Sequence, residues 1–315
     1  MIGHDGVMKA RDHRLRWHEL PDHVRAGIER ALGSSVVEAV SQRGGYGPSL
    51  ASICVLADGR RVFMKAVSPA QNPDSPGMMR REAEIARCLP DGAPAPALLH
   101  DVDDGEWVAL VFEHVEGRLP DTPWDPQELQ RVMAATVELG DLVPRAPLGS
   151  VADYYGSVFV GWRTLAAEQP EAVRDPWCRE HLAELAVAEA HWEHVTAGDR
   201  LIHGDVRSDN VLLTPDGRAV FVDWTSTCTG AGWFDALAML PAVELEGGGP
   251  PEHVMKLVRL ELDSAKIIPL VAAFAGFFTE RGRLPDPPGL PTVRAFQRAQ
   301  GEVTTAWLRR LWGDG

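Results

Sequence analysis

The sequence predicts an α+β protein in which a small antiparallel sheet comes first and helices dominate the remainder. Two β-forming runs, residues 50–56 and 61–67, are separated by an Ala-Asp-Gly-Arg turn at 57–60, which favours a hairpin. From about residue 118 onward, apolar residues recur at helical spacing instead. We therefore expect residues 1 to about 110 to carry strands and one helix, followed by a mainly helical region.

Composition limits the functional classes. The chain has 315 residues, of which 45% are hydrophobic and 24% charged, values typical of one large or two modest globular domains. Its net charge of -14 argues against nucleic acid or an anionic membrane surface as a partner. The charge fits a polar or cationic small-molecule substrate, although many soluble proteins are equally acidic for solubility alone.

The same features bear on localisation. No leader pattern follows Met1, and the longest apolar run, residues 267–278, is too short to span a membrane and contains Pro269. We expect a cytoplasmic protein. Four widely separated cysteines have neither metal-site nor redox-motif spacing, so reduced packing residues are expected: Cys54, Cys88, Cys178 and Cys228.

Residues 203–210, His-Gly-Asp-Val-Arg-Ser-Asp-Asn, give the clearest chemical signal. Two apolar β-rich runs follow, 211–214 and 219–222, around a Pro-Asp-Gly-Arg turn, so we expect an antiparallel hairpin. Extending its register outward places Asn210 opposite Asp223. Amide and carboxylate oxygens suit Mg²⁺, which usually takes one or two protein ligands and leaves its other positions for phosphate and water.

Asp205 lies just upstream on the same loop, where it could accept the proton of a substrate hydroxyl that attacks a γ-phosphate. Arg207, two residues later, is a candidate to neutralise charge on that phosphate, with an outward solvated arginine as the alternative. An acid-rich turn that only caps a loop is the competing interpretation for any one of these residues. Three groups at this spacing favour phosphoryl transfer.

Lys65 is one of only four lysines in the chain and lies in a run whose two faces are otherwise apolar. A buried ammonium needs an anion. We interpret Lys65 as a contact for the α- and β-phosphates of a nucleotide, steadied by a carboxylate, with a snorkelling surface lysine as the alternative. The helical pattern at 80–89 offers Glu82 or Glu84 as that carboxylate. Glu82 is preferred and Glu84 is the reserve.

A glycine-rich segment, Gly-Gly-Tyr-Gly-Pro-Ser at 44–49, precedes the first hairpin. It can bend tightly and present backbone N–H groups to a phosphate, which makes Gly45, Gly47 and Ser49 candidate nucleotide contacts. The segment is not a Walker A loop and supplies only the first two glycines of a Gly-x-Gly-x-x-Gly pattern. A plain glycine-rich turn is the alternative.

Together these motifs resemble the aminoglycoside phosphotransferase family, small-molecule kinases with a bilobal protein-kinase-like fold. The resemblance covers roughly residues 35 to 240. It implies that Asp205 is the catalytic aspartate, that Asn210 and Asp223 bind Mg²⁺, and that Lys65 contacts phosphate. The family also has an acid buried under the catalytic loop, and the resemblance assigns that structural role to Asp235.

The resemblance further implies the organisation of the chain. It predicts an N-lobe over residues 1–112, a hinge at 113–117 and a helical C-lobe over 118–315 that carries the catalytic loop and the substrate pocket. The nucleotide base would lie against Phe112, Glu113 and Val115. Backbone groups of Glu113 and Val115 would bond the purine edge, which leaves both ATP and GTP open as donors.

The sequence also departs from known patterns. Asp223 is followed by Trp224-Thr225 rather than the Phe-Gly of protein kinases, and no activation-loop phosphosite arrangement follows. Residues 226–232, Ser-Thr-Cys-Thr-Gly-Ala-Gly, lack the charged substrate contacts of the antibiotic-resistance branch. The expected function is Mg²⁺-dependent transfer of the γ-phosphate to a hydroxyl of an aminoglycoside-like or other natural-product antibiotic. The alternatives are a kinase of choline, homoserine or an amino sugar, and a nucleotide-binding pseudokinase that acts as an interaction module.

Helices are expected at about 126–140, 153–167, 176–197, 231–240, 251–281 and 291–312. For the first of these, Asp125 is the expected N-cap and Pro126 the first helical residue. The glutamates of the 176–197 stretch are expected mostly on a solvated face rather than around a cationic ligand: Glu180, Glu184, Glu189 and Glu193. An aromatic cluster could form a platform for a sugar or base, but helix packing is favoured: Tyr154, Tyr155, Phe159 and Trp162.

Overall fold

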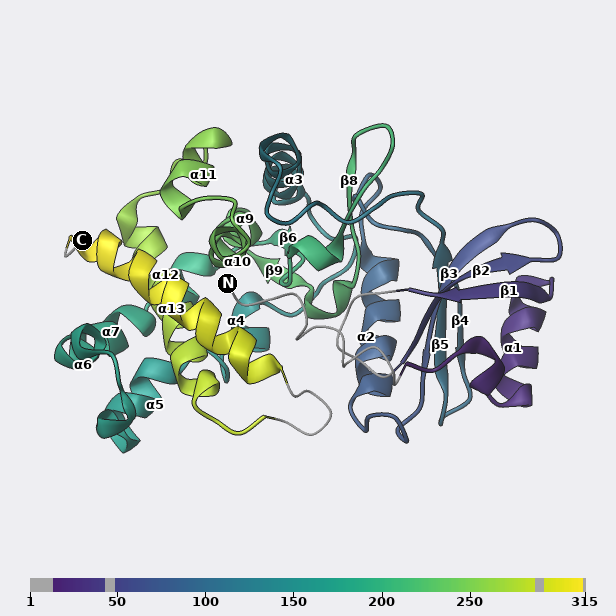
Figure 1. Ribbon diagram of the computed structural model, residues 1–315, viewed down its shortest axis with the longest axis horizontal. Helices are drawn as coiled ribbons and strands as arrows, with labels where there is room; N and C mark the ends of the chain where they lie inside the picture. Colours follow the sequence, from purple (N-terminus) through teal and green to yellow (C-terminus); the bar gives the residue numbers. More distant parts are fainter. Residues whose placement is uncertain (1–13, 43–48, 287–291, 314–315) are drawn as a thin grey trace. The chain divides into compact units, whose positions relative to one another are not determined.

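The computed structural model describes residues 14–42, 49–286 and 292–313. The chain forms two compact units (Figure 1). The N-terminal unit runs to Arg118 and also includes 212–216 and 220–225, two segments that we expected in the C-lobe. The remaining residues form the helical unit. The hinge at 113–117 stays a prediction.

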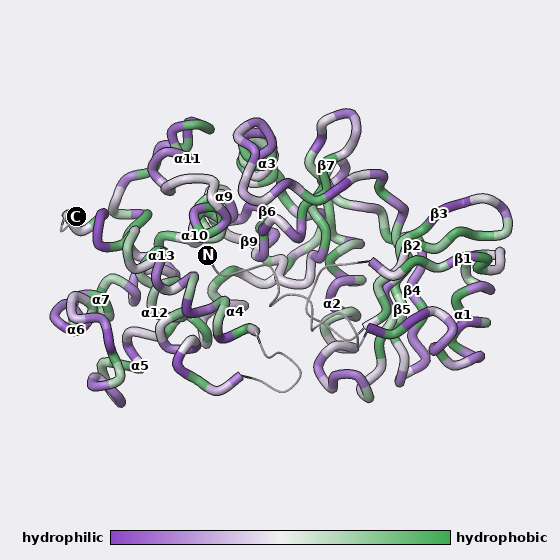
Figure 2. Tube along the Cα trace, viewed as in Figure 1, coloured by the Kyte–Doolittle hydropathy of each residue, from purple (hydrophilic) through white to green (hydrophobic). Residues whose placement is uncertain are grey.

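The N-terminal unit is built on a five-stranded antiparallel sheet with the strand order β1-β2-β3-β5-β4. The predicted hairpin is confirmed as β2 and β3, whose register pairs Leu50 with Ala66. Hydrophobic residues concentrate along the central strands (Figure 2). The strands are β1 (Val36–Ser41), β2 (Leu50–Leu56), β3 (Arg61–Val67), β4 (Leu98–Asp103) and β5 (Val108–Glu113).

A helix covers each face of this sheet (Figure 1). Val62, Met64 and Ala66 of β3 belong to the core cluster of α1 (Asp22–Leu32). Phe63 and Val67 alternate with them and pack with α2 (Ser75–Cys88). Because strand side chains alternate between faces, Lys65 emerges on the α2 side. The sequence predicted α2 but not α1, although Val24, Ile28 and Leu32 recur at helical spacing along its buried side.

A second hairpin is formed by β7 (Val211–Leu213) and β8 (Ala219–Phe221), as predicted. Leu213 exchanges two backbone hydrogen bonds with Arg118, and the Phe221 N–H donates to the Pro94 carbonyl. These contacts attach the hairpin to the N-terminal unit, so that the segment containing Asp223 follows directly from a fixed strand.

The helical unit packs around α12, whose middle, residues 270–275, is buried on all sides. A helix that is apolar all round belongs in a core. A short sheet pairs β6 (Arg200–Ile202) with β9 (Cys228–Gly230). The helices are α3 (Pro126–Leu139), α4 (Val151–Tyr155), α5 (Gly161–Glu168), α6 (Pro176–Glu180), α7 (Leu182–Glu189), α8 (Trp192–Thr196), α9 (Phe234–Ala238), α10 (Leu240–Leu245), α11 (Pro251–Leu257), α12 (Ser264–Gly282) and α13 (Val293–Trp312).

Helix ends were predicted well where a cap was recognised. Asp125 accepts hydrogen bonds from the backbone N–H groups of Gln127 and Glu128, and Pro126 opens α3 as expected. The single helix predicted over 251–281 is wrong. It is two helices, because Asp263 caps α12 through the Ala265 N–H and Arg259 before it has a left-handed φ of 55°.

The helix predicted over 176–197 is also wrong, because the chain breaks it into α6, α7 and α8. At each break a histidine Nδ1 bonds the carbonyl four residues earlier, His181 to Trp177 and His191 to Val187. Such side-chain bonds compete with the backbone ladder. The predicted helix over 153–167 is likewise divided, between α4 and α5.

Glu189 corrects the prediction of a solvated glutamate face. Glu180, Glu184 and Glu193 are exposed, but Glu189 is fully buried. Its carboxylate accepts hydrogen bonds from the backbone N–H groups of Trp162 and Arg163 at 2.9 and 3.0 Å. The first turn of α5 supplies these donors, so Glu189 holds that helix against α7.

Within the described residues, no helix is both long enough and apolar enough to span a membrane.

Gly161 tests how closely α5 and α12 approach each other. A Cβ atom at Gly161 would lie 2.0 Å from the Gly276 carbonyl oxygen, a backbone atom that cannot move aside. We expect Gly161→Ala to lower the free energy of unfolding by about 3 kcal/mol. Gly77→Ala is the matched control, because a Cβ in α2 meets open space there, and it should raise stability by about 0.5 kcal/mol. Urea unfolding measures both, and equal effects would contradict the close crossing.

Candidate active site

In the N-terminal unit, Lys65 lies between two carboxylates. Its Nζ is 2.7 and 3.0 Å from the two Glu82 oxygens and 3.2 Å from Asp223 Oδ1. The Lys65 side chain is 18% exposed and that of Glu82 only 4%. Glu82, from α2, is therefore the partner of Lys65, whereas Glu84 is exposed on the same helix. The three side chains form a charged cluster, which we call the Lys65 cluster.

Burial and charge act in opposite directions on Lys65. Loss of water disfavours its ammonium, but Glu82 and Asp223 outweigh this effect and raise the pKa of Lys65. Burial raises the pKa of Glu82, while the Lys65 charge lowers it. Lys65 therefore keeps its proton, and its ammonium is a fixed positive charge held between two carboxylates.

Helix α2 also holds the segment that follows β8. The Glu82 carboxylate accepts a hydrogen bond from the Trp224 backbone N–H, and Arg81 Nε donates to the Thr225 carbonyl at 3.0 Å. Between these contacts and β8, Asp223 has a φ of 68°, a left-handed conformation that aspartate tolerates better than most residues. The backbone is thus shaped so that Asp223 meets Lys65.

In the helical unit, the predicted catalytic loop is tightly cross-linked. Arg207 Nη1 donates to both Asp205 oxygens at 2.7 and 3.0 Å. Arg207 Nε donates to Asp209 Oδ1 at 3.0 Å. Asn210 Nδ2 donates to the Asp205 carbonyl at 2.9 Å and to its carboxylate at 3.1 Å. Asp205 therefore has a defined side-chain orientation, and its carboxylate is stabilised as an anion.

The start of this loop is anchored from two sides. Asp235 of α9, 3% exposed, accepts hydrogen bonds from the backbone N–H groups of His203 and Gly204 at 2.7 and 2.9 Å. The Tyr155 hydroxyl donates to the Gly204 carbonyl at 2.7 Å. Gly204 has a φ of 83°, and a Cβ there would lie 2.6 Å from the Ser226 carbonyl oxygen. No other residue fits this position.

Tyr155 is an anchor that the sequence did not reveal. Its ring stacks on Phe159 at 4.9 Å between centroids and on Phe234 at 6.0 Å, so the favoured packing role is borne out for this part of the aromatic cluster. The contact of its hydroxyl with Gly204 depends on chain segments 49 residues apart. Local sequence carries no signal for such a contact.

The expected base-binding residues are placed as follows. Glu113 ends β5 and its N–H donates to the Ala97 carbonyl at 2.9 Å. Phe112 is 5% exposed in the core cluster on the α2 side. Val115 lies beyond the strand and Ser49 just before β2. Gly45 and Gly47 lie outside the described residues.

The residues present suit a magnesium ion. Asn210 Nδ2 donates to both the carbonyl and the carboxylate of Asp205, which fixes the amide and turns its oxygen away from that residue. Asp223 is 46% exposed and so keeps carboxylate surface beyond its contact with Lys65. Both are hard oxygen donors of the kind Mg²⁺ prefers. Asn210 belongs to the helical unit and Asp223 to the N-terminal unit, so their meeting at one ion stays a prediction.

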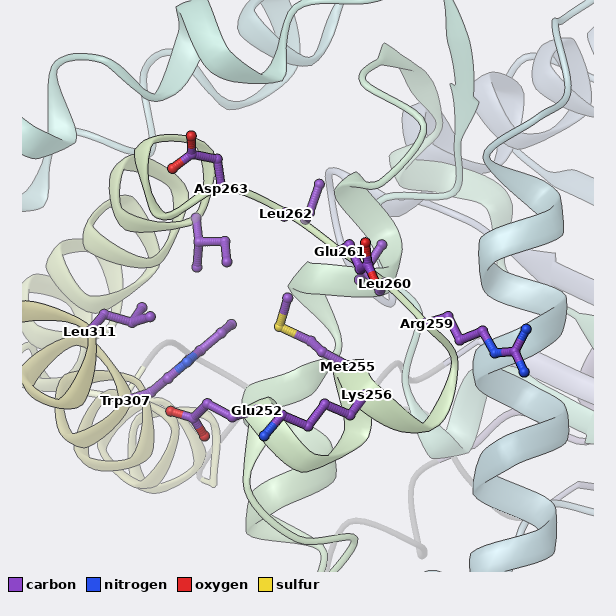
Figure 3. A pocket seen from close by; sticks show the side chains of 11 residues that line it. Glu252, Met255, Lys256, Arg259, Leu260, Glu261, Leu262, Asp263, Trp307 and Leu311 are labelled. Atoms are coloured by element: carbon purple, nitrogen blue, oxygen red, sulfur yellow. The ribbon is translucent and has the colours of Figure 1, made fainter.

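Two cavities lie elsewhere in the helical unit. One, of about 560 Å³, has Trp307 and Leu311 of α13 and Met255 of α11 among its walls (Figure 3). The other, of about 620 Å³, is lined partly by arginines. Neither includes a residue of the Lys65 cluster or of the Asp205 loop, so neither is assigned to the active site.

Removal of Lys65 should expose the cost of a buried charge. We expect Lys65→Met to lower the free energy of unfolding by about 3 kcal/mol, because Glu82 then stays buried without a counter-charge, and Lys65→Met/Glu82→Met to recover most of it. Arg87→Met, which breaks an exposed pair with Asp101, should cost less than about 1 kcal/mol. Urea unfolding compares the three, and equal losses for Lys65→Met and Arg87→Met would be inconsistent with a buried pair.

Asp235 should make stability depend on pH. Burial raises its pKa from 3.8 to about 6, against the two backbone N–H bonds, which lower it. The folded state therefore favours the protonated form, and this contribution is lost as the pH rises through about 6. Relative to Asp235→Asn, which does not titrate, we expect the wild-type free energy of unfolding to fall by about 1.4 kcal/mol from pH 5 to pH 8. A difference that does not change with pH would contradict the shift.

Sequence comparison identifies relatives of the chain. The profile of the phosphotransferase enzyme family (APH) matches residues 51–259, about two thirds of the chain. A homoserine kinase from Methylobacterium radiotolerans is 33% identical over 84 residues. That match spans 26% of this chain and only 26% of the curated relative.

Solved structures show the fold. A spectinomycin phosphotransferase, solved with ADP and spectinomycin, has a TM-score of 0.57 at 10% identity, covering 90% of this chain and 97% of that one. A choline kinase from Streptococcus pneumoniae has a TM-score of 0.51 at 14% identity, covering 90% and 100%. The predicted α+β kinase-like fold is confirmed. With its family profile matched from β2 to beyond residues 203–210, the chain belongs to the phosphotransferase enzyme family.

Proposed function

We propose that this kinase transfers the γ-phosphate of ATP or GTP to a hydroxyl group of an aminoglycoside-like or other natural-product antibiotic, in a Mg²⁺-dependent reaction. The observation that carries the proposal is the anchored loop, in which Asp205 is oriented by Arg207 and Asn210 while Asp235 holds the backbone before it. Phosphoryl transfer depends mostly on positioning and electrostatics. A rigidly held carboxylate is what such a reaction requires of its base.

Asp205 orients the acceptor hydroxyl and takes its proton as the oxygen attacks phosphorus. The carboxylate is 36% exposed on its loop, so it remains accessible to an acceptor. Arg207, paired with Asp205 and Asp209, supplies a positive charge that can neutralise charge developing on the γ-phosphate. The hydrogen bonds that Arg207 and Asn210 donate to the Asp205 carboxylate also keep it from rotating away from the acceptor hydroxyl.

Lys65 binds the α- and β-phosphates. Glu82 holds its ammonium at 2.7 Å, so little side-chain entropy is lost when phosphate arrives. Magnesium, held by Asn210 and Asp223, would neutralise phosphate charge when bound. The purine would bond the Glu113 carbonyl and the Val115 backbone beside Phe112, with Gly45, Gly47 and Ser49 near the phosphates. The Glu113 N–H is engaged by the Ala97 carbonyl, so the contact proposed for Glu113 is through its carbonyl.

A metabolite kinase is the second candidate. The observation that favours it is the local match to a homoserine kinase at 33% identity, together with the fold shared with a choline kinase. The acceptor would then be choline, homoserine or an amino sugar. A nucleotide-binding pseudokinase is the third possibility, which the complete set of Lys65, Asp205, Asn210 and Asp223 argues against.

A product screen tests the function. The purified protein is incubated with Mg²⁺, ATP or GTP, and a panel of aminoglycosides, spectinomycin, macrolides, choline, homoserine and amino sugars, and phosphorylated product is detected by mass. We expect one antibiotic class to be phosphorylated. Asp205→Asn should lower kcat by about 10² to 10⁴-fold with little change in nucleotide affinity, since the aspartate acts on the acceptor.

Asp209→Asn is the matched control, because Asp209 also binds Arg207 but is assigned no chemistry, and its kcat should change less than about tenfold. Phosphorylation of a metabolite alone would select the second candidate. Normal turnover by Asp205→Asn would show that Asp205 is not the residue that deprotonates the acceptor. Absence of any product, with no Mg²⁺-dependent nucleotide hydrolysis, would select the pseudokinase.

A further inference from the structure

We infer that Glu246 is a positioning residue of the active site, which fixes the turn between Asp205 and Asn210 through a hydrogen bond to Ser208. The inference rests on the proposed function, because it assigns Glu246 a part in keeping the catalytic loop in its working geometry. No sequence motif points to Glu246, which follows α10 some 36 residues after Asn210.

Each oxygen of Glu246 has its own donor. Oε1 accepts from the Ser208 hydroxyl at 2.7 Å, and Oε2 accepts from Trp124 Nε1 at 3.0 Å. The Trp124 backbone N–H also donates to the Glu246 carbonyl at 3.2 Å. Trp124 is only 6% exposed and precedes the N-cap of α3. Glu246 is therefore held by side chain and main chain against a buried residue, and it offers Ser208 a fixed acceptor.

Ser208 is well placed to transmit that position. It begins the 3₁₀ turn Ser208–Asn210, in which the Asn210 N–H donates to the Arg207 carbonyl at 2.9 Å. Asn210 in turn bonds the Asp205 carboxylate. A shift of Ser208 therefore moves Asn210, which lies in the same turn, and disturbs its hydrogen bond to Asp205. Asp235 and Tyr155 hold the loop at Gly204, whereas Glu246 holds it four residues later.

The choice of a carboxylate supports a functional role. Burial and the nearby Asp209 raise the pKa of Glu246. The hydrogen bonds from Ser208 and Trp124 and the charge of Arg207 lower it. A partly buried acid beside an acid-rich loop is unfavourable unless it is compensated. Charge-assisted hydrogen bonds are shorter and stronger than neutral ones, so the ionised group gives a stiffer constraint on Ser208 than an amide or hydroxyl.

A double-mutant cycle tests the inference. We expect Ser208→Ala and Glu246→Gln each to lower kcat about 5- to 30-fold, with the KM for nucleotide changed less than about twofold, because the loop is misplaced but phosphate binding by Lys65 is retained. The double variant should be no slower than the slower single variant, since both changes remove one interaction. Glu244→Gln is the control. Glu244 lies on α10 but pairs with Arg310, and its kcat should stay within about twofold.

Hydrogen exchange gives a readout that does not need activity. Ser208→Ala and Glu246→Gln should both speed amide exchange over residues 204–211 by more than about threefold, and Glu244→Gln should not. Unchanged kcat and exchange in both variants would overturn the inference, as would strictly additive losses, which indicate two independent effects. If the wild type shows no kinase activity, the proposed function fails, and exchange alone decides whether Glu246 positions the loop.

Discussion

The loop at residues 203–210, which we propose to be catalytic, depends on one buried carboxylate, that of Asp235. It accepts hydrogen bonds from the backbone N–H groups of two successive residues, His203 and Gly204. These bonds fix the backbone at Gly204, whose φ of 83° only glycine can adopt at this position. The pKa of about 6 measures the balance between burial, which opposes the charge, and these donors, which favour it. Asp205 follows directly, so the direction in which its carboxylate leaves the backbone is set by a residue that takes no part in chemistry.

The N-terminal unit solves a similar problem with Glu82. This carboxylate, 4% exposed, binds the Lys65 ammonium and the Trp224 backbone N–H. It therefore orients the Lys65 ammonium, the proposed phosphate contact, and the segment that carries Asp223 at the same time. In each unit a buried acid lies next to a proposed functional residue. Asp235 holds two backbone N–H groups, whereas Glu82 holds a backbone N–H group and the Lys65 side chain. A neutral residue could pack at position 82, but it would leave the Lys65 ammonium without this partner.

The sequence predicted those features that depend on neighbouring residues, such as strand alternation and helix caps. Alternation along β3 placed Lys65 on the face that α2 covers, and Asp125 with Pro126 gave the start of α3. The period of apolar residues did not show that 251–281 is interrupted, because Asp263 acts through a cap rather than through hydrophobicity. Glu189, Tyr155 and Glu246 were missed as structural contacts because their partners are 26 to 122 residues away. Charge and spacing alone cannot indicate which glutamate a fold will bury.

The anchoring network also explains why this sequence indicates the chemistry better than the acceptor. Asp235, Tyr155 and Glu82 each form a hydrogen bond with a backbone group. These contacts do not depend on the identity of the acceptor. Solved structures with this fold include a spectinomycin phosphotransferase and a choline kinase, whose names give different substrates. Under the proposed function, side chains outside these anchoring contacts would select the acceptor. Residues 226–232, which carry no charged side chain, leave that discrimination to hydroxyls, shape and more distant parts of the helical unit.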